Sequence, residues 1–452
     1  MKRSRYSYFF ESGPQFVGYS WLADDYVAFS LEDKENVKQV LQEPEGVVTN
    51  GDARIFEKLL KKRIIIPEKV NEFLHIREQH KLAILDTNRL RLIILPTFAC
   101  NLDCPYCYET GKANKMAPSV INNIKSYLEN RAPDLKRIRL SWFGGEPLLY
   151  PEIIREIGRF ASDLAAENQV EFVSDVTTNG TLLTEDGALN ELSRAGVRKA
   201  HVTIDGGKNT HDRKRVPVDG SGTYEQITGN SKRFLDADSE NELTLRVHVH
   251  SGERREIQGI KRILSEFEGY RNRLKVYFRR VFSSCLDGPD QDLPGDEGKS
   301  SVSAGGQSKL EIAMEELYRE AVDRGFELNF SRRSLASCYA AYNSTWVVKP
   351  DGFLHKCTLA LEKERPLGEL TEAGINLFWD SYLHWKERST RQFIEGEIRN
   401  CSEFPLSWGR CPYANFRNPD KSTESQELKN SIRTREKVLA LKSRYRRRGD
   451  AD

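Results

Sequence analysis

The architecture expected for the whole chain follows from the segment Leu92-Ile93-Ile94-Leu95-Pro96-Thr97-Phe98-Ala99-Cys100-Asn101-Leu102-Asp103-Cys104-Pro105-Tyr106-Cys107. It begins as an apolar run typical of a buried β-strand and continues as a loop with cysteines in the spacing C-x3-C-x2-C. Three thiolates on one short loop can bind three of the four irons of a cubane iron–sulfur cluster, which leaves the fourth iron open to a small molecule. A zinc site is the first alternative, although zinc takes four ligands and no His or further Cys lies nearby. Three unrelated buried cysteines are the second alternative.

Beyond this segment, apolar β-rich runs alternate with helical patterns. The expected strands are Leu92–Pro96, Ile138–Phe143, Val170–Thr177, Lys199–Ile204, Leu243–His250 and Leu274–Phe278. The expected helices are Ser119–Glu129, Pro151–Ala166, Thr184–Arg194, Tyr224–Asp236 and Glu253–Phe267. Strands separated by helices of this length form βαβ units with a parallel sheet and right-handed crossovers. We therefore predict an α/β fold, a partial (β/α)6 TIM-type barrel, with functional residues just after the strands.

Polar segments containing glycine do follow the next three strands. They are Ser141-Trp142-Phe143-Gly144-Gly145-Glu146-Pro147, then Thr177-Thr178-Asn179-Gly180-Thr181, then Thr203-Ile204-Asp205-Gly206 with His211-Asp212-Arg213-Lys214-Arg215 behind it. Glycines allow a ligand to approach the backbone closely, and a carboxylate suits an ammonium group.

These segments, together with the cysteine loop and its aromatic Tyr106, resemble the radical S-adenosylmethionine (radical SAM) superfamily. The resemblance implies a 4Fe-4S cluster and bound SAM. The cluster ligands would be Cys100, Cys104 and Cys107, and the SAM contacts would come from Tyr106, Gly144, Gly145, Glu146, Asn179, Thr203 and Asp205. Thr203 stands where the sulfatase-maturase-like, peptide-modifying branch has Ser in its Ser-x-Asp-Gly segment.

Some of these polar residues have simpler interpretations. Asp205 and His211 are equally well explained by turn capping and loop packing. His248 and His250 alternate on the fifth strand and so share a face, but each is more simply a satisfied core histidine. The sequence identifies no individual catalytic residue.

The remaining cysteines resemble a degenerate form of SPASM, a C-terminal extension that holds two further clusters in peptide-modifying members. Lys349-Pro350-Asp351-Gly352-Phe353-Leu354-His355-Lys356-Cys357 is similar to its Pro-Asp-Gly hairpin. The four places of its C-x2-C-x5-C-x3-C pattern are Ile398, Cys401, Ser407 and Cys411. Two cubanes need eight thiolates, and the loop leaves only five of the eight cysteines.

We therefore expect one auxiliary iron–sulfur cluster, whose ligands are Cys338, Cys357, Cys401 and Cys411. Zinc or a metal-free remnant is the alternative. We interpret the fifth cysteine, Cys285, as a loop or packing residue. Thr358 stands where sulfatase maturases have an Asp that takes the substrate proton, and a hydroxyl cannot act as a base near neutral pH.

Four parts of the chain differ in pattern. Residues 1–88 predict a small α+β domain for leader-peptide recognition, or alternatively a structural cap. Residues 89–330 form the radical SAM barrel with a loop at 285–308, residues 331–425 form the SPASM-like domain, and residues 426–452 form a basic helix. In the first part, short strands at Phe16–Leu22 and Tyr26–Leu31 make a hairpin, and helices follow at Lys34–Gln42, at Asp52–Lys62 and up to about Lys81.

Composition excludes several classes of protein. The 452 residues carry 69 Lys+Arg against 67 Asp+Glu, so no net field attracts nucleic acid or a membrane surface. No apolar run approaches roughly 18 residues, which argues against a transmembrane helix. The start of the chain has too short an apolar run for a signal peptide, so we expect a cytoplasmic protein.

The resemblance implies reductive cleavage of SAM and removal of a hydrogen atom from a substrate carbon. The expected partners are a precursor peptide or protein, modified by a cross-link or a related change, and an external one-electron reductant of the flavodoxin or ferredoxin type. Sulfatase-type maturation or small-molecule chemistry on the same scaffold is an alternative. A non-catalytic iron–sulfur electron carrier is another, although the full series of SAM-pocket segments argues against it.

Overall fold

The fold is that of a computed structural model, which describes residues 1–44, 50–109, 114–217, 219–280, 309–329, 338–361 and 363–390. Three expectations lie outside the described residues: the loop at 285–308, the basic helix at 426–452, and the cysteines Cys285, Cys401 and Cys411.

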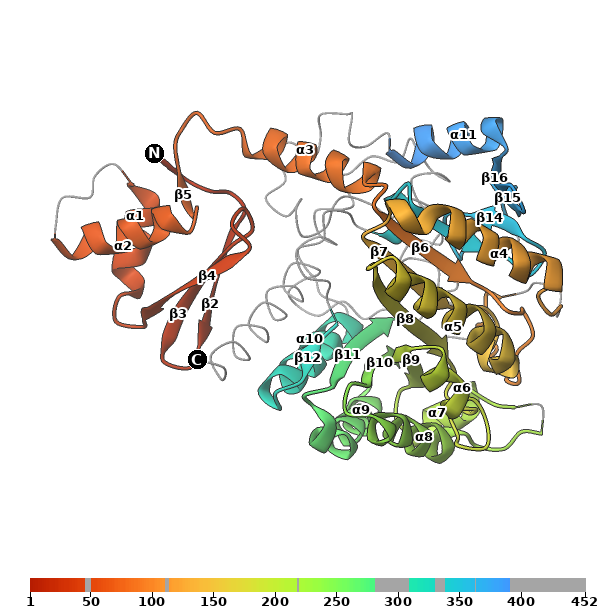
Figure 1. The fold of residues 1–452 in the computed structure, drawn as a ribbon. Coiled ribbons are helices and arrows are strands. Elements are labelled where there is room, and N and C mark those ends of the chain that lie inside the picture. The colour runs from red at the N-terminus through yellow and green to blue at the C-terminus, as the bar shows by residue number, and fades with distance from the viewer. Residues whose placement is uncertain are drawn as a thin grey trace.

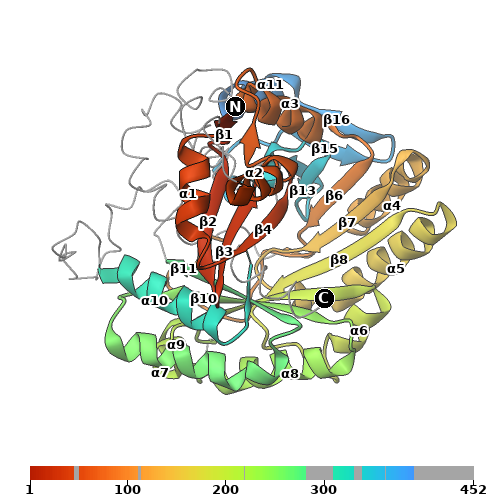
Figure 2. The ribbon, with the colours of Figure 1, turned by 90° about the vertical axis from the view of Figure 1, so that its left-hand side faces the viewer.

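Six parallel strands, neighbours in chain order, form the centre of the molecule. They are β6 (Arg89–Ile94), β7 (Arg137–Trp142), β8 (Glu171–Thr178), β9 (Val197–Asp205), β10 (Glu242–Val249) and β11 (Leu274–Arg280). The helices that follow them are α4 (Pro118–Arg131), α5 (Pro151–Glu167), α6 (Leu189–Arg194), α7 (Lys208–Lys214), α8 (Tyr224–Ala237), α9 (Arg254–Glu266) and α10 (Lys309–Asp323). Figure 2 shows the strands arranged around a centre with the helices outside. The predicted partial (β/α)6 barrel is confirmed.

Most predicted elements agree with the structure to within a few residues. The helix expected from Thr184 begins only at Leu189, and α7 was not predicted. Short 3-10 helices η1 (Ala132–Asp134), η2 (Pro147–Leu149), η3 (Glu268–Tyr270) and η4 (Tyr339–Ala341) complete the connections.

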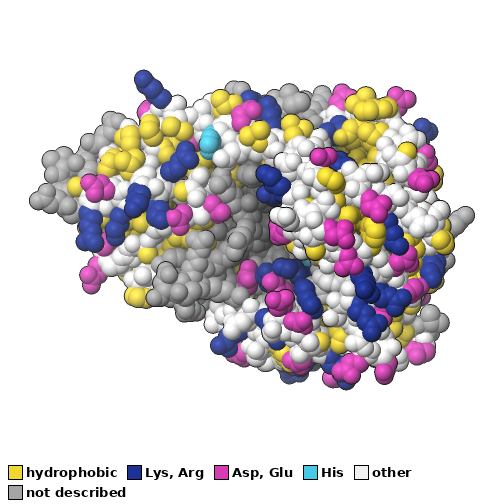
Figure 3. Space-filling model, viewed as in Figure 1, with side chains coloured by type: hydrophobic (Ala, Val, Ile, Leu, Met, Phe, Trp, Pro, Cys, Tyr) yellow, Lys and Arg dark blue, Asp and Glu magenta, His cyan; other side chains and the backbone are white. Residues whose placement is uncertain are grey.

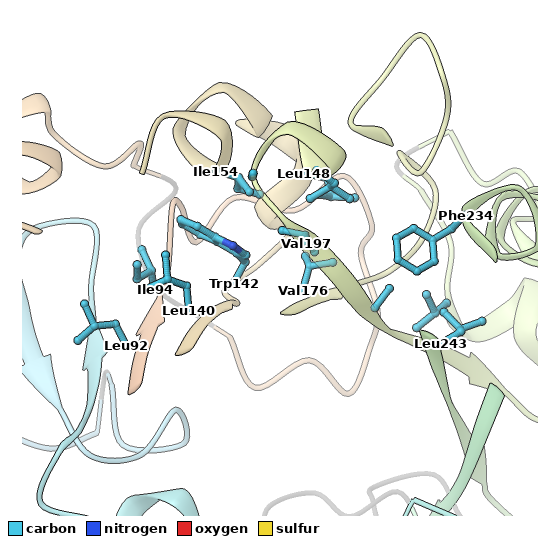
Figure 4. Packing of buried hydrophobic residues seen from close by; sticks show 14 of the residues in the cluster. Leu92, Ile94, Leu140, Trp142, Leu148, Ile154, Val176, Val197, Phe234 and Leu243 are labelled. Atoms are coloured by element: carbon cyan, nitrogen blue, oxygen red, sulfur yellow. The ribbon is translucent and has the colours of Figure 1, made fainter. Parts of the chain in front are cut away.

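The two faces of the barrel strands differ in polarity. The face toward the helices is apolar and forms one large core, to which strand residues such as Leu140 and Trp142 and helix residues such as Ile154 and Phe234 belong (Figure 4). Because side chains alternate along a strand, the intervening residues point to the other face, into the barrel. That inner face carries charged residues such as Arg139 and Asp175, beside a small apolar cluster that includes Ile93.

The sheet continues past the barrel at both edges, which the sequence did not predict. The additional elements are β12 (Glu327–Leu328), β13 (Thr345–Val348), β14 (Phe353–His355), β15 (Gly368–Thr371), β16 (Gly374–Leu377) and α11 (Trp379–Thr390). Strand β13 pairs in parallel with β6, and β14 to β16 follow in antiparallel order. The Pro-Asp-Gly segment forms the β13–β14 turn, where Gly352 has a φ of +87° that suits glycine. Cys357 follows β14, and only β13 lies between β14 and β6, the strand that precedes the cysteine loop.

The N-terminal part has its own small cores. Strands β2 (Ser7–Ser12), β3 (Gln15–Ser20) and β4 (Asp25–Ser30) form an antiparallel sheet; α1 (Lys34–Gln42) and α2 (Asn50–Lys61) follow; β1 (Lys2–Arg3) pairs with β5 (Ile65–Ile66). Helix α3 (Glu72–Leu85) leads from this part to the barrel (Figure 1). The predicted hairpin is present as β3 and β4, whereas β2 was missed.

The surface agrees with the balanced composition. Acidic and basic side chains are interspersed over the face shown in Figure 3. Every helix in the described ranges is too short or too polar to cross a membrane.

Candidate active site

The cysteine loop directly follows β6, as predicted. Cys100 and Cys107 are exposed and Cys104 is half-buried. The loop backbone is tied to the segment after α7, because Asp103 N donates to Val216 O at 2.8 Å and Leu102 forms a β-bridge with Pro217. The thiols therefore stay accessible while their backbone is fixed.

The donor set fits a cluster better than a single ion. Among the described residues, no three His, Cys, Asp or Glu side chains converge as they would around one metal ion. Thiols spread along one loop suit a cubane, in which each thiolate binds its own iron. Burial raises the pKa of the Cys104 thiol to about 11 and also raises the pKa values of Cys100 and Cys107. Iron binding would have to displace these protons, as is usual for thiolate ligation.

Gly144 and Gly145 pack against the backbone of the cysteine loop. A Cβ on Gly145 would lie 2.3 Å from the carbonyl oxygens of both Phe98 and Ala99. Gly144 has a φ of +118°, and a Cβ there would lie 2.3 Å from Thr97 O. No side chain fits at these distances, so the two glycines are what allow the loop to lie here.

Glu146 is fully buried and joins the ends of β7 and β8. One carboxylate oxygen accepts hydrogen bonds from Leu148 N at 3.0 Å and Thr178 Oγ1 at 2.8 Å. The other accepts one from Asn179 N at 2.7 Å. Burial raises the pKa of Glu146 even though these donors act in the opposite direction. Its carboxylate thus braces the site, and its predicted contact with the SAM amino group stays a prediction.

Asn179 lies beside the first cysteine. Its Nδ2 is 3.8 Å from Cys100 Sγ and donates to Asn101 Oδ1 at 2.8 Å. Asn101 in turn donates to Thr181 Oγ1 at 2.9 Å. The end of β8 and the cysteine loop are therefore joined by amide and hydroxyl groups.

Asp205, at the end of β9, is the centre of a buried polar network. One oxygen lies 2.5 Å from His248 Nδ1 on β10, and the other accepts a hydrogen bond from the Tyr106 hydroxyl of the cysteine loop. Arg215 Nη1 also donates to that hydroxyl at 3.3 Å. Burial alone would raise the pKa of Asp205, but the hydrogen bond from His248 and the nearby His250 ring, whose Nε2 lies 3.6 Å away, hold it well below its usual range. A charged Asp205 thus clamps the loop to two strands.

The other residues of these segments are buried nearby. Thr203 lies on β9 in register with Arg246 of β10. His211 Nδ1 accepts a hydrogen bond from Asp205 N at 3.3 Å, and its Nε2 lies 3.0 Å from Thr223 Oγ1. His211 therefore packs and caps the turn after β9.

Cys338 and Cys357 are both next to a residue of one hydroxyl pair, Tyr339 and Thr358. Cys338 precedes Tyr339, and both the Cys338 and Cys357 thiols act electrostatically on the Tyr339 hydroxyl. That hydroxyl lies 3.0 Å from Thr358 Oγ1 and accepts a hydrogen bond from Thr358 N at 3.2 Å. The side chain at position 358 is therefore paired with a phenol.

Three residues that the structure places in the site were given no role from the sequence. Arg215 and His248 meet at Tyr106 and Asp205, and Tyr339 meets Thr358. Only the shared face of His248 and His250 could have signalled one of them, because the other contacts join distant segments.

Similarity to known proteins agrees with this site. Residues 94–262 match the family model of the radical SAM superfamily. The serine-type anaerobic sulfatase-maturating enzyme of Klebsiella aerogenes is 25% identical over 344 residues, which cover 70% of this chain and 77% of the relative. The cysteine-type anaerobic sulfatase-maturating enzyme of Clostridium novyi is 23% identical over 350 residues, covering 71% and 87%.

A solved structure of native anSMEcpe with bound AdoMet and Cp18Cys peptide has the same fold, with a TM-score of 0.58 at 17% identity. It covers 79% of this chain and 99% of that chain. The predicted resemblance is confirmed, and with it the 4Fe-4S cluster and SAM as cofactors.

Replacement of Gly145 tests whether its packing against the cysteine loop is needed for cluster binding while all the cysteines are kept. We expect Gly145→Ala to push the loop out of place, because its Cβ would meet two carbonyl oxygens. Reconstituted iron should fall by about half or more, and SAM cleavage should fall about a hundredfold. Gly269→Ala, where nothing lies within 4 Å, is the matched control. Normal iron content and rate in Gly145→Ala would contradict this packing.

His211 makes the stability of the protein depend on pH. Burial lowers the pKa of His211 to about 4, whereas an unfolded histidine titrates near 6.5. Between these values the unfolded chain binds a proton that the folded chain does not, so stability is lost as the pH falls. From about pH 7 to about pH 5, His211 should remove about 2 kcal/mol from the free energy of unfolding.

Urea unfolding of the protein before cluster reconstitution measures this effect. His211→Asn keeps a hydrogen-bond acceptor for Asp205 N and has no titrating ring. Its free energy of unfolding should fall by about 2 kcal/mol less over the same pH interval. Equal losses in both proteins would show that His211 is not held neutral.

Proposed function

Because the chain is a radical SAM enzyme of the sulfatase-maturase and peptide-modifying branch, we propose that it acts on a precursor peptide or protein and installs a cross-link or a related change at carbon. The observation that carries the proposal is the convergence of the three-cysteine loop, the glycine pair, Asn179 and Asp205 at one end of the barrel strands. With the cluster and SAM bound, the cofactors supply a 5′-deoxyadenosyl radical that removes hydrogen from an unactivated carbon.

The protein's own residues hold this chemistry in place. Cys100, Cys104 and Cys107 would bind the cluster, and the Gly144-Gly145 backbone and Asn179 would orient SAM. The Asp205 carboxylate fixes the loop through Tyr106, and the barrel interior receives the substrate. A closed interior also excludes water from a reactive species.

The Thr358–Tyr339 pair argues for a modification other than sulfatase maturation. Burial raises the pKa of Tyr339 well above its usual range, so its phenol stays protonated. Thr358 does not ionise near neutral pH either, and the two hydroxyls bond to each other. A reaction that needs no carboxylate base at this position is therefore favoured. The likeness to sulfatase-maturating enzymes keeps that activity as the second candidate.

Residues 1–88 would recognise the leader part of the substrate. In the three-stranded sheet of the described N-terminal part, β2 and β4 each pair on one side only. An extended peptide can add to such an edge by main-chain hydrogen bonds. Binding at a distance from the barrel would hold the reacting residue in place. A structural cap on the barrel is the alternative.

The auxiliary cluster is the remaining part of the proposal. Cys338 and Cys357 both act electrostatically on the Tyr339 hydroxyl, and Cys401 and Cys411, which would complete four ligands, lie outside the described residues. An external one-electron reductant of the flavodoxin or ferredoxin type would reduce the site.

SAM cleavage tests the enzyme activity. The anaerobically reconstituted protein should form 5′-deoxyadenosine from SAM with dithionite, and Cys104→Ala should abolish it because the cluster loses one of its three ligands. Cys285→Ala, which removes a cysteine that is not among the predicted ligands, is the control. Incubation with a short peptide encoded beside the enzyme, followed by mass spectrometry, then tests the substrate class. An electron carrier would produce no 5′-deoxyadenosine.

Iron content tests the auxiliary cluster. We expect about eight irons per reconstituted chain and about four in Cys357→Ala, because each cubane holds four. The variant should still cleave SAM without a substrate. About four irons in the unchanged protein would exclude a second cubane.

A further inference from the structure

Two arginines point into the barrel from neighbouring strands and have no part in the site described above. On β10, Arg246 lies between the outward-facing Leu245 and Val247, so its side chain takes the inner face. On β11, Arg279 occupies the same face, because His248 of β10 pairs with Arg279 and Arg246 pairs with Tyr277. The two residues are therefore diagonal neighbours on the paired strands β10 and β11.

Arg246 has no hydrogen-bond or acidic partner among the described residues. Its Nε is buried without a hydrogen-bond partner. Burial lowers the pKa of Arg246, and the positive charges of Arg279 and Arg215 lower it further. The phenols of Tyr108 and Tyr277 act in the opposite direction. Arg246 is half-buried as a whole, and its buried Nε lacks a hydrogen-bond acceptor that a bound anion could supply.

The arginines deeper in the barrel do have hydrogen-bond partners. Arg139 Nε lies 2.7 Å from Asp175 Oδ1. Arg91 donates to Ser141 Oγ at 3.1 Å and stacks over the Tyr339 ring. Asp175 is the acidic partner in the layer of Arg91 and Arg139. Within the described ranges, no Asp or Glu forms an ion pair with Arg246.

The strand register places Arg246 beside the predicted cofactor site. Arg246 of β10 pairs with Thr203 of β9, a predicted SAM contact, and His248, two residues further on, pairs with Asp205. A group bound by Arg246 would therefore lie next to SAM.

We propose that Arg246, together with Arg279, binds a carboxylate of the peptide substrate close to the residue that loses hydrogen. The inference rests on the proposed function and names a feature of its substrate. Guanidinium groups bind carboxylates through paired hydrogen bonds, and a bound carboxylate would supply the missing partner. The carboxylate can be an Asp or Glu side chain or the C-terminus of the peptide, and the experiment distinguishes these two sources.

Binding of small probes to the full, reconstituted, SAM-bound chain tests the proposal. The side-chain probe is N-acetyl-glutamic acid α-amide, compared with N-acetyl-glutamine α-amide. The C-terminal probe is N-acetylglycine, compared with N-acetylglycinamide. By calorimetry we expect one carboxylate to bind about tenfold more tightly than its amide, as a charge-assisted hydrogen bond implies.

Substitution of Arg246 should remove this preference. Arg246→Gln should bind acid and amide equally, and Arg246→Lys should keep part of the tenfold difference because it keeps the charge. Arg159→Gln, on the outside of α5 with a 72% exposed side chain, is the control and should change nothing. Iron content and circular dichroism equal to those of the unchanged protein would show that the variants fold.

Three results would overturn the proposal. The first is no preference for either carboxylate in the unchanged protein, and the second is a preference that survives in Arg246→Gln. The third is a tenfold loss of SAM affinity in Arg246→Gln, which would assign the arginine to the SAM carboxylate. Measurement of 5′-deoxyadenosine in the same samples distinguishes failure of the carboxylate site from failure of the proposed function. A carboxylate preference without SAM cleavage would overturn the proposed function and leave the anion site.

Discussion

The packing of Gly144 and Gly145 against the cysteine loop is the contact on which the rest of the site depends. Carbonyl oxygens of the loop approach these glycines so closely that no Cβ can lie between them. The loop is held from the other side by Tyr106, which donates to Asp205. Glu146 then ties the glycine segment to β8. Three separate strand ends therefore fix one short loop, and the thiols of Cys100 and Cys107 remain exposed because the loop is held by its backbone and by other side chains.

The charged residues inside the barrel explain how such a site can receive a substrate. An apolar interior would fill with side chains, as closed barrels do. Here Arg91 and Arg139 share one acid, Asp175, in the deeper layer. Nearer the strand ends, the positive charges of Arg215 and Arg246 are opposed by few acids among the described residues, chiefly Asp205. Among these residues, the basic side chains outnumber the acidic ones in both layers.

The barrel could be predicted from the sequence because its strands and helices alternate in hydrophobic pattern, and each polar segment was placed after the correct strand. Strand β2 and the extension of the sheet through β13 to β16 were missed. These strands are short, and their partners are distant in the chain, as with Val347 of β13 beside Ile93 of β6. Hydrogen-bond partners were missed for the same reason. Glu146 joins two strands because the fold brings hydrogen-bond donors from a distant segment to it. The local sequence pattern does not predict these donors.

The pairing of Thr358 with Tyr339 shows how one scaffold can be directed to different chemistry. The fold is shared with a solved anSMEcpe structure, and the chain is similar to enzymes named as sulfatase-maturating, at 25% identity or less. The residue after Cys357 lies on a loop that follows β14, so it can change without disturbing the barrel core. A carboxylate there would be available as a base, whereas two mutually bonded hydroxyls are not. Hydrogen removal needs only the cluster, SAM and a positioned carbon, so the groups around a bound substrate decide which product forms.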